Sequence, residues 1–256
     1  MTALLTFMKK DLLEQIRSGK LLILLIVFTL FGIMNPAVAK MTPWLLEIMS
    51  ESLEQSGMTI TPVSVSAMDS WVQFFKNIPM ALIVFALMQG GALSGEYKSG
   101  TLILSLTKGL ERYKVVISKS CLLLGLWSVF YWLCFGITYL YNAYFWDNSI
   151  AKNLGFSAIC WWIFGIFTIS LMILSSTVTS SFSGVLLITG GFVFVSSILG
   201  ALPKIKDYTP TLLTDGTSLI FDKLQPSDYL PCLGITLALT IICFGASFPV
   251  FNKKQL

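Results

Sequence analysis

The chain has 256 residues, of which 55% are hydrophobic and 12% are charged, with a formal net charge of +4. Soluble domains carry about 25% charged residues, so the composition excludes an ordinary soluble domain and indicates segments that cross a bilayer. The chain contains no histidine, which excludes His-based acid/base catalysis and His-ligated metals. Its five cysteines lie in or beside apolar runs without a CxxC pair, so we interpret them as packing residues.

Residues 1–18 are predicted to form an amphipathic interfacial helix. The apolar residues that recur at spacings of three and four, and so share one face, are Leu5, Met8, Leu12 and Ile16. Lys10 and Glu14 are spaced as an i,i+4 ion pair. We expect this helix to lie on the inner leaflet, with its basic residues toward anionic lipid and a bend at Ser18-Gly19. The alternative is a frayed tail.

Six apolar runs are long enough to be transmembrane helices, so we predict an all-α integral membrane protein with a single transmembrane domain over 1–256. The predicted spans are 21–39, 77–94, 115–141, 156–174, 185–202 and 229–251. Only helices satisfy their own backbone hydrogen bonds in lipid without closing a barrel. Ala37-Val38-Ala39 has the form of a signal-peptide cleavage site, but the preceding apolar run is long for a signal, so we expect a span.

The basic residues predict the orientation. With the N-terminus inside, the inner segments and the first turn of the third span hold eleven Lys and Arg residues, against six in the outer segments. This difference follows the positive-inside bias. We therefore expect a multi-pass protein of the cell (plasma) membrane with both termini in the cytoplasm.

The outer segment 203–228 is rich in Pro and Gly and is predicted to be irregular, whereas Trp44–Leu53 is predicted to form a short surface helix.

A few polar and aromatic residues within the spans are candidates for a translocation path. They are Asn35, Gln89, Trp127 and Tyr131. Asn35 precedes Pro36, where we expect the first span to kink or end, and Gln89 precedes the small residues Gly90-Gly91. Structural hydrogen bonding and packing between helices is the alternative role for all four.

The loop at 95–114 is the most informative segment. Ser99 or Thr101 is predicted to cap a short helix, and Gly109 is predicted to end it. The apolar side of that helix would be formed by Leu102, Ile103 and Leu106. On composition alone, a charged loop that only enforces topology is the alternative. The chain contains no GxxxxGK[ST] motif, so the sequence offers no P-loop for nucleotide.

The pattern Glu96-x3-Gly100-Thr101-Leu102, followed by Arg112 and Lys119 before a span, resembles the loop between the second and third spans of ABC-2 type (type V fold) permeases. The resemblance covers about 25 residues in motif and the whole chain in architecture. It departs at Lys108-Gly109-Leu110, where many members have Pro before the Arg. It implies that this loop is a cytoplasmic coupling helix that docks on an ATPase subunit. The predicted contact residues are Glu96, Tyr97, Lys98, Gly100, Thr101, Leu102 and Arg112.

The expected function is therefore the permease subunit of an ATP-driven ABC exporter, without enzymatic activity or cofactors of its own. The resemblance implies a separate ATPase subunit that binds ATP and Mg, and a second permease copy, identical or paralogous; lipid is the other partner, and no nucleic acid is expected. A hydrophobic or amphipathic peptide or antibiotic is the cargo we favour. The alternatives are an ion-coupled or passive six-helix carrier or channel, and an intramembrane enzyme. No span carries an ionisable residue at mid-depth, and an ion-coupled carrier usually needs one.

Overall fold

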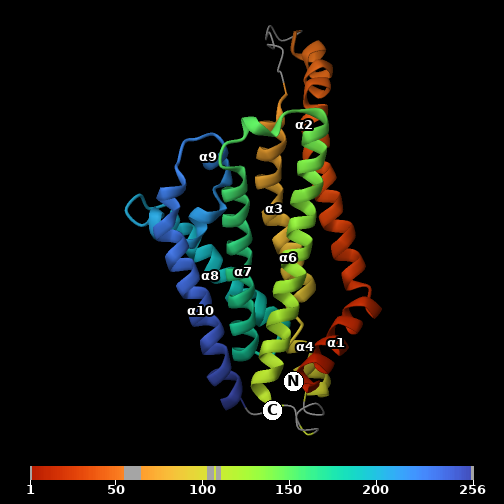
Figure 1. The fold of residues 1–256 in the computed structure, drawn as a ribbon, viewed down its shortest axis with the longest axis vertical. Coiled ribbons are helices and arrows are strands. Elements are labelled where there is room, and N and C mark those ends of the chain that lie inside the picture. Colours follow the sequence, from red (N-terminus) through yellow and green to blue (C-terminus); the bar gives the residue numbers. More distant parts are fainter. Residues whose placement is uncertain (1, 55–64, 103–106, 108–110, 255–256) are drawn as a thin grey trace.

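The computed structural model describes residues 2–54, 65–102, 107 and 111–254, and every regular element within these residues is helical. Six helices are long and apolar enough to cross a membrane, which confirms the predicted all-helical fold with six candidate spans. They run side by side as an elongated bundle, with both termini at the same end (Figure 1). The short helices α1 (Thr2–Arg17) and α4 (Ser94–Ser99) also lie at this end, which we call the terminal end.

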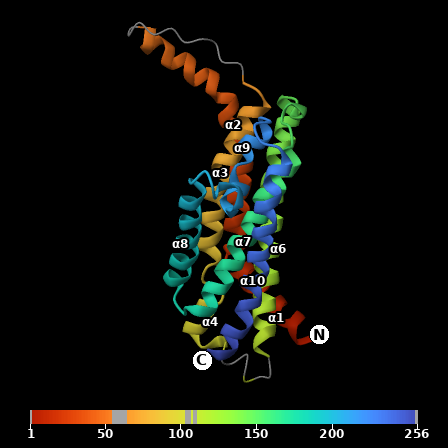
Figure 2. The ribbon, with the colours of Figure 1, turned by 90° about the vertical axis from the view of Figure 1, so that its left-hand side faces the viewer.

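The spanning helices are longer than predicted. The chain folds into α2 (Lys20–Glu54), α3 (Ala67–Gln89), α6 (Arg112–Phe145), α7 (Leu154–Val178), α8 (Phe182–Gly200) and α10 (Leu230–Lys253). Of the most apolar 18-residue stretch of each helix, 72% is buried in α7 and 17% in α8. Helix α7 therefore forms the centre of the bundle, whereas α8 lies at its edge (Figure 2).

The first spanning helix differs from its prediction. Helix α2 continues through both Pro36 and Pro43 as far as Glu54, so the expectation that it could end at Pro36 was wrong. The segment Trp44–Leu53 is helical, but as an extension of α2 rather than as a separate surface helix. Figure 2 shows this last part of α2 leaning away from the other helices at the end opposite the termini.

Small residues allow close approach between the helices. At Gly165 in α7, a Cβ atom would overlap the indole of Trp127 in α6. At Gly32 in α2, a Cβ would lie 2.9 Å from Cβ of Ile137 in α6. Both glycines therefore leave room for a neighbouring side chain, which is the packing role that small residues play between membrane helices.

The segment between α8 and α10 is more ordered than predicted. It contains the helix α9 (Gly216–Ile220) and three 3₁₀ turns at Lys206–Tyr208, Pro210–Thr214 and Pro226–Tyr229. Its buried apolar residues include Leu212, Leu213, Leu219 and Ile220. The indole of Trp161 in α7 donates a 2.8 Å hydrogen bond to the Thr214 carbonyl. The segment therefore packs against the end of the bundle instead of forming a loose loop.

The turn between α1 and α2 confirms the bend predicted at Ser18-Gly19. Helix α1 ends at Arg17, and α2 begins at Lys20. Gly19 has a φ of +72°, a left-handed conformation that glycine adopts without steric cost. The bend turns α1 across the terminal end of the bundle (Figure 1).

Candidate functional site

Four charged side chains from three elements meet at the terminal end of the bundle. We call Lys10, Asp11, Glu96 and Lys119 the charged cluster. The Lys119 ammonium, on α6, lies 3.0 Å from Oδ2 of Asp11 on α1 and 3.0 Å from Oε1 of Glu96 on α4. Lys10 donates a second hydrogen bond to the same Glu96 oxygen at 3.2 Å. The cluster therefore joins the N-terminal helix, the short helix α4 and a spanning helix.

Three members of the cluster are buried: Asp11, Glu96 and Lys119 are 2%, 6% and 5% exposed. Burial raises the pKa of the Asp11 carboxyl above its ordinary value, against the opposing effect of the Lys119 charge. Breaking one member of a buried ion pair costs about 3–5 kcal/mol, because the remaining charge is left without compensation. The contacts are therefore expected to hold the three elements together.

The same region brings three carboxylates together. One oxygen each of Asp11, Glu14 and Glu96 lies within 4.8 Å of the others, a spacing that would suit a divalent cation. The Lys119 ammonium, however, is hydrogen-bonded at 3.0 Å to Glu96 and ion-paired at 3.0 Å with Asp11. We therefore interpret Lys119 as the resident cation of this group of carboxylates.

A reciprocal amide pair reinforces the attachment of α1. Gln15 on α1 donates a 2.9 Å hydrogen bond to Oε1 of Gln89 at the end of α3. Gln89 donates back to Oε1 of Gln15 at 3.1 Å. Both side chains are buried, so each amide supplies a hydrogen-bond partner to the other. Gln89, which the sequence made a candidate for the translocation path, is thus hydrogen-bonded where α1 meets the end of α3.

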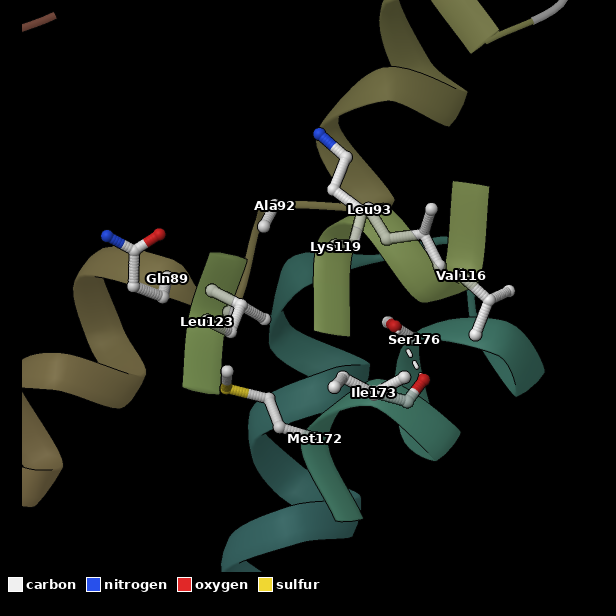
Figure 3. A pocket seen from close by; sticks show the side chains of 10 residues that line it. Gln89, Ala92, Leu93, Val116, Lys119, Leu123, Met172, Ile173 and Ser176 are labelled. Carbon is white, nitrogen blue, oxygen red and sulfur yellow. Dashed lines mark hydrogen bonds between the residues drawn. The ribbon is translucent and has the colours of Figure 1, made fainter. Parts of the chain in front are cut away.

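Apolar side chains of α6 and α7 pack together on the side of Lys119 that faces α7. In Figure 3 the Lys119 ammonium points away from Met172 and Ile173 of α7, which lie on the opposite side of its backbone. The cavity between the end of α3, α6 and α7 has a volume of about 10 Å³, enough for about one water. A larger cavity of about 480 Å³ lies on the other side, between α1 and α4, and is lined by Lys10, Glu14 and Lys20 among others.

A second set of contacts attaches α4 and α6 to the end of α10. The Arg112 guanidinium donates hydrogen bonds of 3.2, 3.0 and 2.7 Å to the carbonyls of Phe251, Asn252 and Lys254. The Tyr97 ring lies 6.1 Å from the Phe251 ring and 4.2 Å from the Lys254 ammonium. Arg112 therefore caps the carbonyl end of the last helix, where a positive charge is favourable.

The other predicted contact residues lie around a turn at Gly100. Gly100 has a φ of +68° and ends α4, a helix that the sequence did not predict. The described residues of the helix predicted after this glycine, Thr101, Leu102 and Thr107, are helical. Thr101 is exposed, whereas Leu102 is fully buried. The Lys98 side chain and the segments 103–106 and 108–110, including the helix end predicted at Gly109, lie outside the described residues. Whether any of these residues contacts an ATPase stays a prediction.

The remaining path candidates are also bonded within the subunit. Asn35 donates to Thr138 at 3.2 Å and accepts from Asn77 at 2.9 Å. The Trp127 indole donates to the Trp162 carbonyl at 3.2 Å, and the Tyr131 hydroxyl donates to the Ala158 carbonyl at 2.7 Å. These contacts are compatible with the structural role that the sequence also allowed, and their place in a path is untested.

Sequence reasoning missed the partners of the charged cluster on α1. It expected Lys10 to pair with Glu14, whereas the structure pairs Lys10 with Glu96. The missed signal is a second stripe on α1: Phe7, Asp11 and Gln15 are spaced four residues apart and are all buried. The predicted apolar face is instead exposed at Leu5, Leu12 and Ile16, so α1 presents one face to the bundle and another outward.

Comparison with known proteins agrees with this architecture. The family described as "ABC-2 family transporter protein" matches residues 5–205 of the chain. The match begins within α1, includes α4 and the charged cluster, and ends after α8. No curated protein matches the chain.

Proposed function

The chain belongs to the ABC-2 transporter family, and from this premise we propose that it is the permease subunit of an ATP-driven ABC exporter. Members of this family are multi-pass membrane permeases, so the chain is a transport subunit rather than an enzyme. ABC-2 permeases pair with ATPase subunits. We propose that a separate ATPase binds ATP and Mg and docks at the terminal end of this chain.

The single observation that carries the proposal is the position of α4 between two sets of contacts. Glu96 ties α4 to α1 and α6 through Lys10 and Lys119, while Tyr97 packs against Phe251 of α10. A force applied to α4 would therefore reach three other helices. An element that receives the movement of an ATPase needs such connections, because a ligand or partner acts only through contacts that differ between two states.

We propose that the terminal end faces the cytoplasm. The excess of basic residues in the segments at this end supports the orientation. Exposed apolar residues of α1, such as Leu5 and Ile16, would enter the inner leaflet while Asp11 and Gln15 hold the opposite contacts to the bundle. Helix α1 would thus lie in the membrane interface.

The assembly and cargo are further parts of the proposal. Helices α2 and α8 leave apolar residues such as Ile26, Leu187 and Phe194 exposed, a surface that suits lipid or a second permease copy, identical or paralogous. The spans predicted from the sequence contain a single charged residue, Lys119, about one turn from the span end, so a highly charged cargo would lack partners along the helices. We therefore favour a hydrophobic or amphipathic peptide or antibiotic.

The proposal is tested by purifying the tagged chain from its native membrane and measuring ATP hydrolysis in the eluate. Thr101 is exposed on the proposed docking segment, so Thr101→Glu should reduce the recovered ATPase without changing the elution profile of the permease. Ser227→Glu is the matched control, because Ser227 is exposed at the opposite end of the bundle. Glu96 and Leu102 are less suitable targets because both are buried.

The competing carrier hypothesis makes a different prediction. If the purified chain alone, in liposomes, accumulated cargo on an ion gradient without ATP, the exporter proposal would be wrong. Equal ATPase recovery with the wild type, Thr101→Glu and Ser227→Glu would place the docking surface elsewhere.

A further inference from the structure

A second cavity lies at the end of the bundle opposite the charged cluster, where α6 connects to α7. Its volume is about 730 Å³, and we call it the α6–α7 cavity. The residues that line it come from the last three turns of α6, the connection around the 3₁₀ turn Asn148–Ile150, and the first residues of α7. The charged cluster, the predicted ATPase-contact residues and the four path candidates do not line this cavity.

One wall of the cavity is aromatic. Phe135 and Tyr139 lie one turn apart on α6, and Trp146 directly follows the end of this helix; all three line the cavity. The Phe135 and Tyr139 rings are stacked with centroids 6.2 Å apart, and the Trp71 ring of α3 has its centroid 5.1 Å from that of Phe135. Tyr139 is nevertheless 43% exposed, so this packed wall keeps an accessible aromatic surface.

A fixed carboxylate stands beside this wall. Asp147 accepts hydrogen bonds from the Ser149 backbone N–H at 2.9 Å and from the Ser149 hydroxyl at 2.6 Å. The Ser149 hydroxyl and then its backbone amide lower the pKa of the Asp147 carboxyl. Asp147 is therefore held in one orientation and remains ionised at neutral and mildly acidic pH.

The two asparagines of the cavity are in different states. Both polar atoms of the Asn148 amide are hydrogen-bonded: the oxygen accepts from the Trp71 indole at 3.0 Å and the nitrogen donates to the Tyr139 carbonyl at 3.1 Å. Asn153 makes no side-chain hydrogen bond within the described part of the chain, and it has a φ of +51°. A left-handed non-glycine residue is uncommon, and here it precedes α7 directly. Asn153 thus presents an unused amide at the rim.

No ion pair between Asp147 and a basic residue is present among the residues that the structure describes. None of the described residues that line the cavity is basic. Lys152, between two lining residues, is paired with Asp222 at 2.7 Å. Lys40 lies over the Phe145 ring, 3.6 Å from its centroid. The cavity therefore combines aromatic faces with one uncompensated negative charge.

We propose that the α6–α7 cavity binds the cationic group of an amphipathic molecule, such as a basic side chain of an amphipathic peptide. The ammonium or guanidinium group would pair with Asp147 and lie against the Tyr139 or Trp146 ring, since both interactions favour cations. Apolar atoms next to the charge would cover the aromatic wall, and Asn153 would supply an additional acceptor or donor. The inference rests on the proposed function only in identifying such a molecule with the exported cargo.

Binding is measured with the purified full-length chain in neutral detergent and a fluorescently labelled peptide of alternating Lys and Leu. A peptide with Gln in place of Lys is the uncharged control probe. Asp147→Asn keeps an oxygen that can accept from Ser149 but removes the charge, so the cationic peptide should bind about fivefold more weakly. Tyr139→Leu should weaken binding by a similar factor of about three to five, while the uncharged peptide should be insensitive to Asp147→Asn.

Asp207→Asn is the matched control, since Asp207 is an exposed carboxylate outside the cavity and its loss changes the net charge equally. Equal weakening by Asp147→Asn and Asp207→Asn would show non-specific attraction and overturn the proposal. Displacement of the peptide by free maltose, undiminished in Asp147→Asn, would indicate a carbohydrate site instead. The binding assay needs neither ATP nor transport, so its failure would leave the permease function untouched, and loss of ATPase recovery would leave the binding result untouched.

Discussion

The ammonium of Lys119 lies 3.0 Å from Oε1 of Glu96, and both residues are almost completely buried. Glu96 belongs to the segment that the sequence identified as a docking element, and its carboxylate points into the subunit toward two lysines. The relationship suggests two tasks for this segment. Thr101 is exposed on this segment, where an ATPase could contact it, while Glu96 and Tyr97 connect the segment to the rest of the bundle.

The first prediction concerns the central cation of the charged cluster. Lys119→Met removes the positive charge that lies between Asp11 and Glu96 while preserving an unbranched side chain. The free energy of unfolding should fall by about 3–5 kcal/mol, the usual cost of leaving a buried charge unpaired. The loss is measured by denaturant unfolding of the detergent-purified chain.

Three comparison variants separate the charge from general disruption. Lys119→Arg should retain most of the stability, and adding Asp11→Asn to Lys119→Met should restore part of it by removing an uncompensated carboxylate. Lys204→Met, at an exposed position, should change the unfolding free energy by less than about 0.5 kcal/mol. Equal losses for Lys119→Met and Lys204→Met would show that the charged cluster contributes nothing specific.

The second prediction concerns the buried amide pair. Gln89→Leu leaves the Gln15 amide without its partner, and the reverse is true for Gln15→Leu. Each single variant should lose about 1–3 kcal/mol of unfolding free energy, the cost of an unsatisfied buried amide. The double variant should be less destabilised than the sum of the singles, because no polar group is then left unpaired. Strict additivity in this double-mutant cycle would mean that the two amides do not depend on each other.

Much of the fold follows from local signals in the sequence. The six spans and the bend at Gly19 could be predicted because apolar length and glycine placement are local properties. The continuation of α2 through Pro36 and Pro43 could not, since membrane helices tolerate proline when neighbouring groups satisfy the freed backbone.

The site was only partly predictable for a related reason. The resemblance singled out the Glu96 segment, but not the burial of its carboxylate against residues 86 and 23 positions away. Hydropathy assigned α1 its apolar face at Leu5, Leu12 and Ile16, whereas tertiary packing selected the neighbouring stripe of Phe7, Asp11 and Gln15. Long-range ion pairs leave no periodic signal in one sequence, so their partners emerge only from the folded structure.

The third prediction is a pH dependence of stability at Asp11. Burial raises the pKa of this carboxyl above its ordinary value of 3.8 in the folded state. The folded chain therefore keeps the proton at pH values where the unfolded chain has lost it, so the carboxyl's contribution to stability declines as the pH rises above 3.8. Asp11→Asn removes this titration and should gain stability relative to the wild type as the pH is raised.

The comparison is made by following thermal unfolding of both proteins from pH 4 upward in one detergent. Lys10, Glu96 and Lys119 face the same carboxyl and are present in both proteins, so they contribute similarly to each curve. Asp207→Asn, at an exposed position, should run parallel to the wild type. If the wild type instead became more stable relative to Asp11→Asn with rising pH, the Lys119 charge would lower the pKa of the Asp11 carboxyl by more than burial raises it.

The fourth prediction tests the packing of α6 against α7. Trp127 fills the space left by the missing side chain of Gly165 and donates its indole N–H to the Trp162 carbonyl. Gly165→Ala would place a methyl group inside the indole, so either the ring or the two helices must move. Because overpacking a close-packed core usually costs about 1–3 kcal/mol, the variant should lose that amount of unfolding free energy despite the higher helix propensity of alanine.

Gly190→Ala in α8 is the control, since its Cβ would meet nothing within 4 Å, and it should be neutral or stabilising by up to about 1 kcal/mol. If Gly165→Ala were as stable as Gly190→Ala, the indole would not be held against α7, and Trp127 would be free to turn toward a path for cargo, as the sequence-based hypothesis proposed.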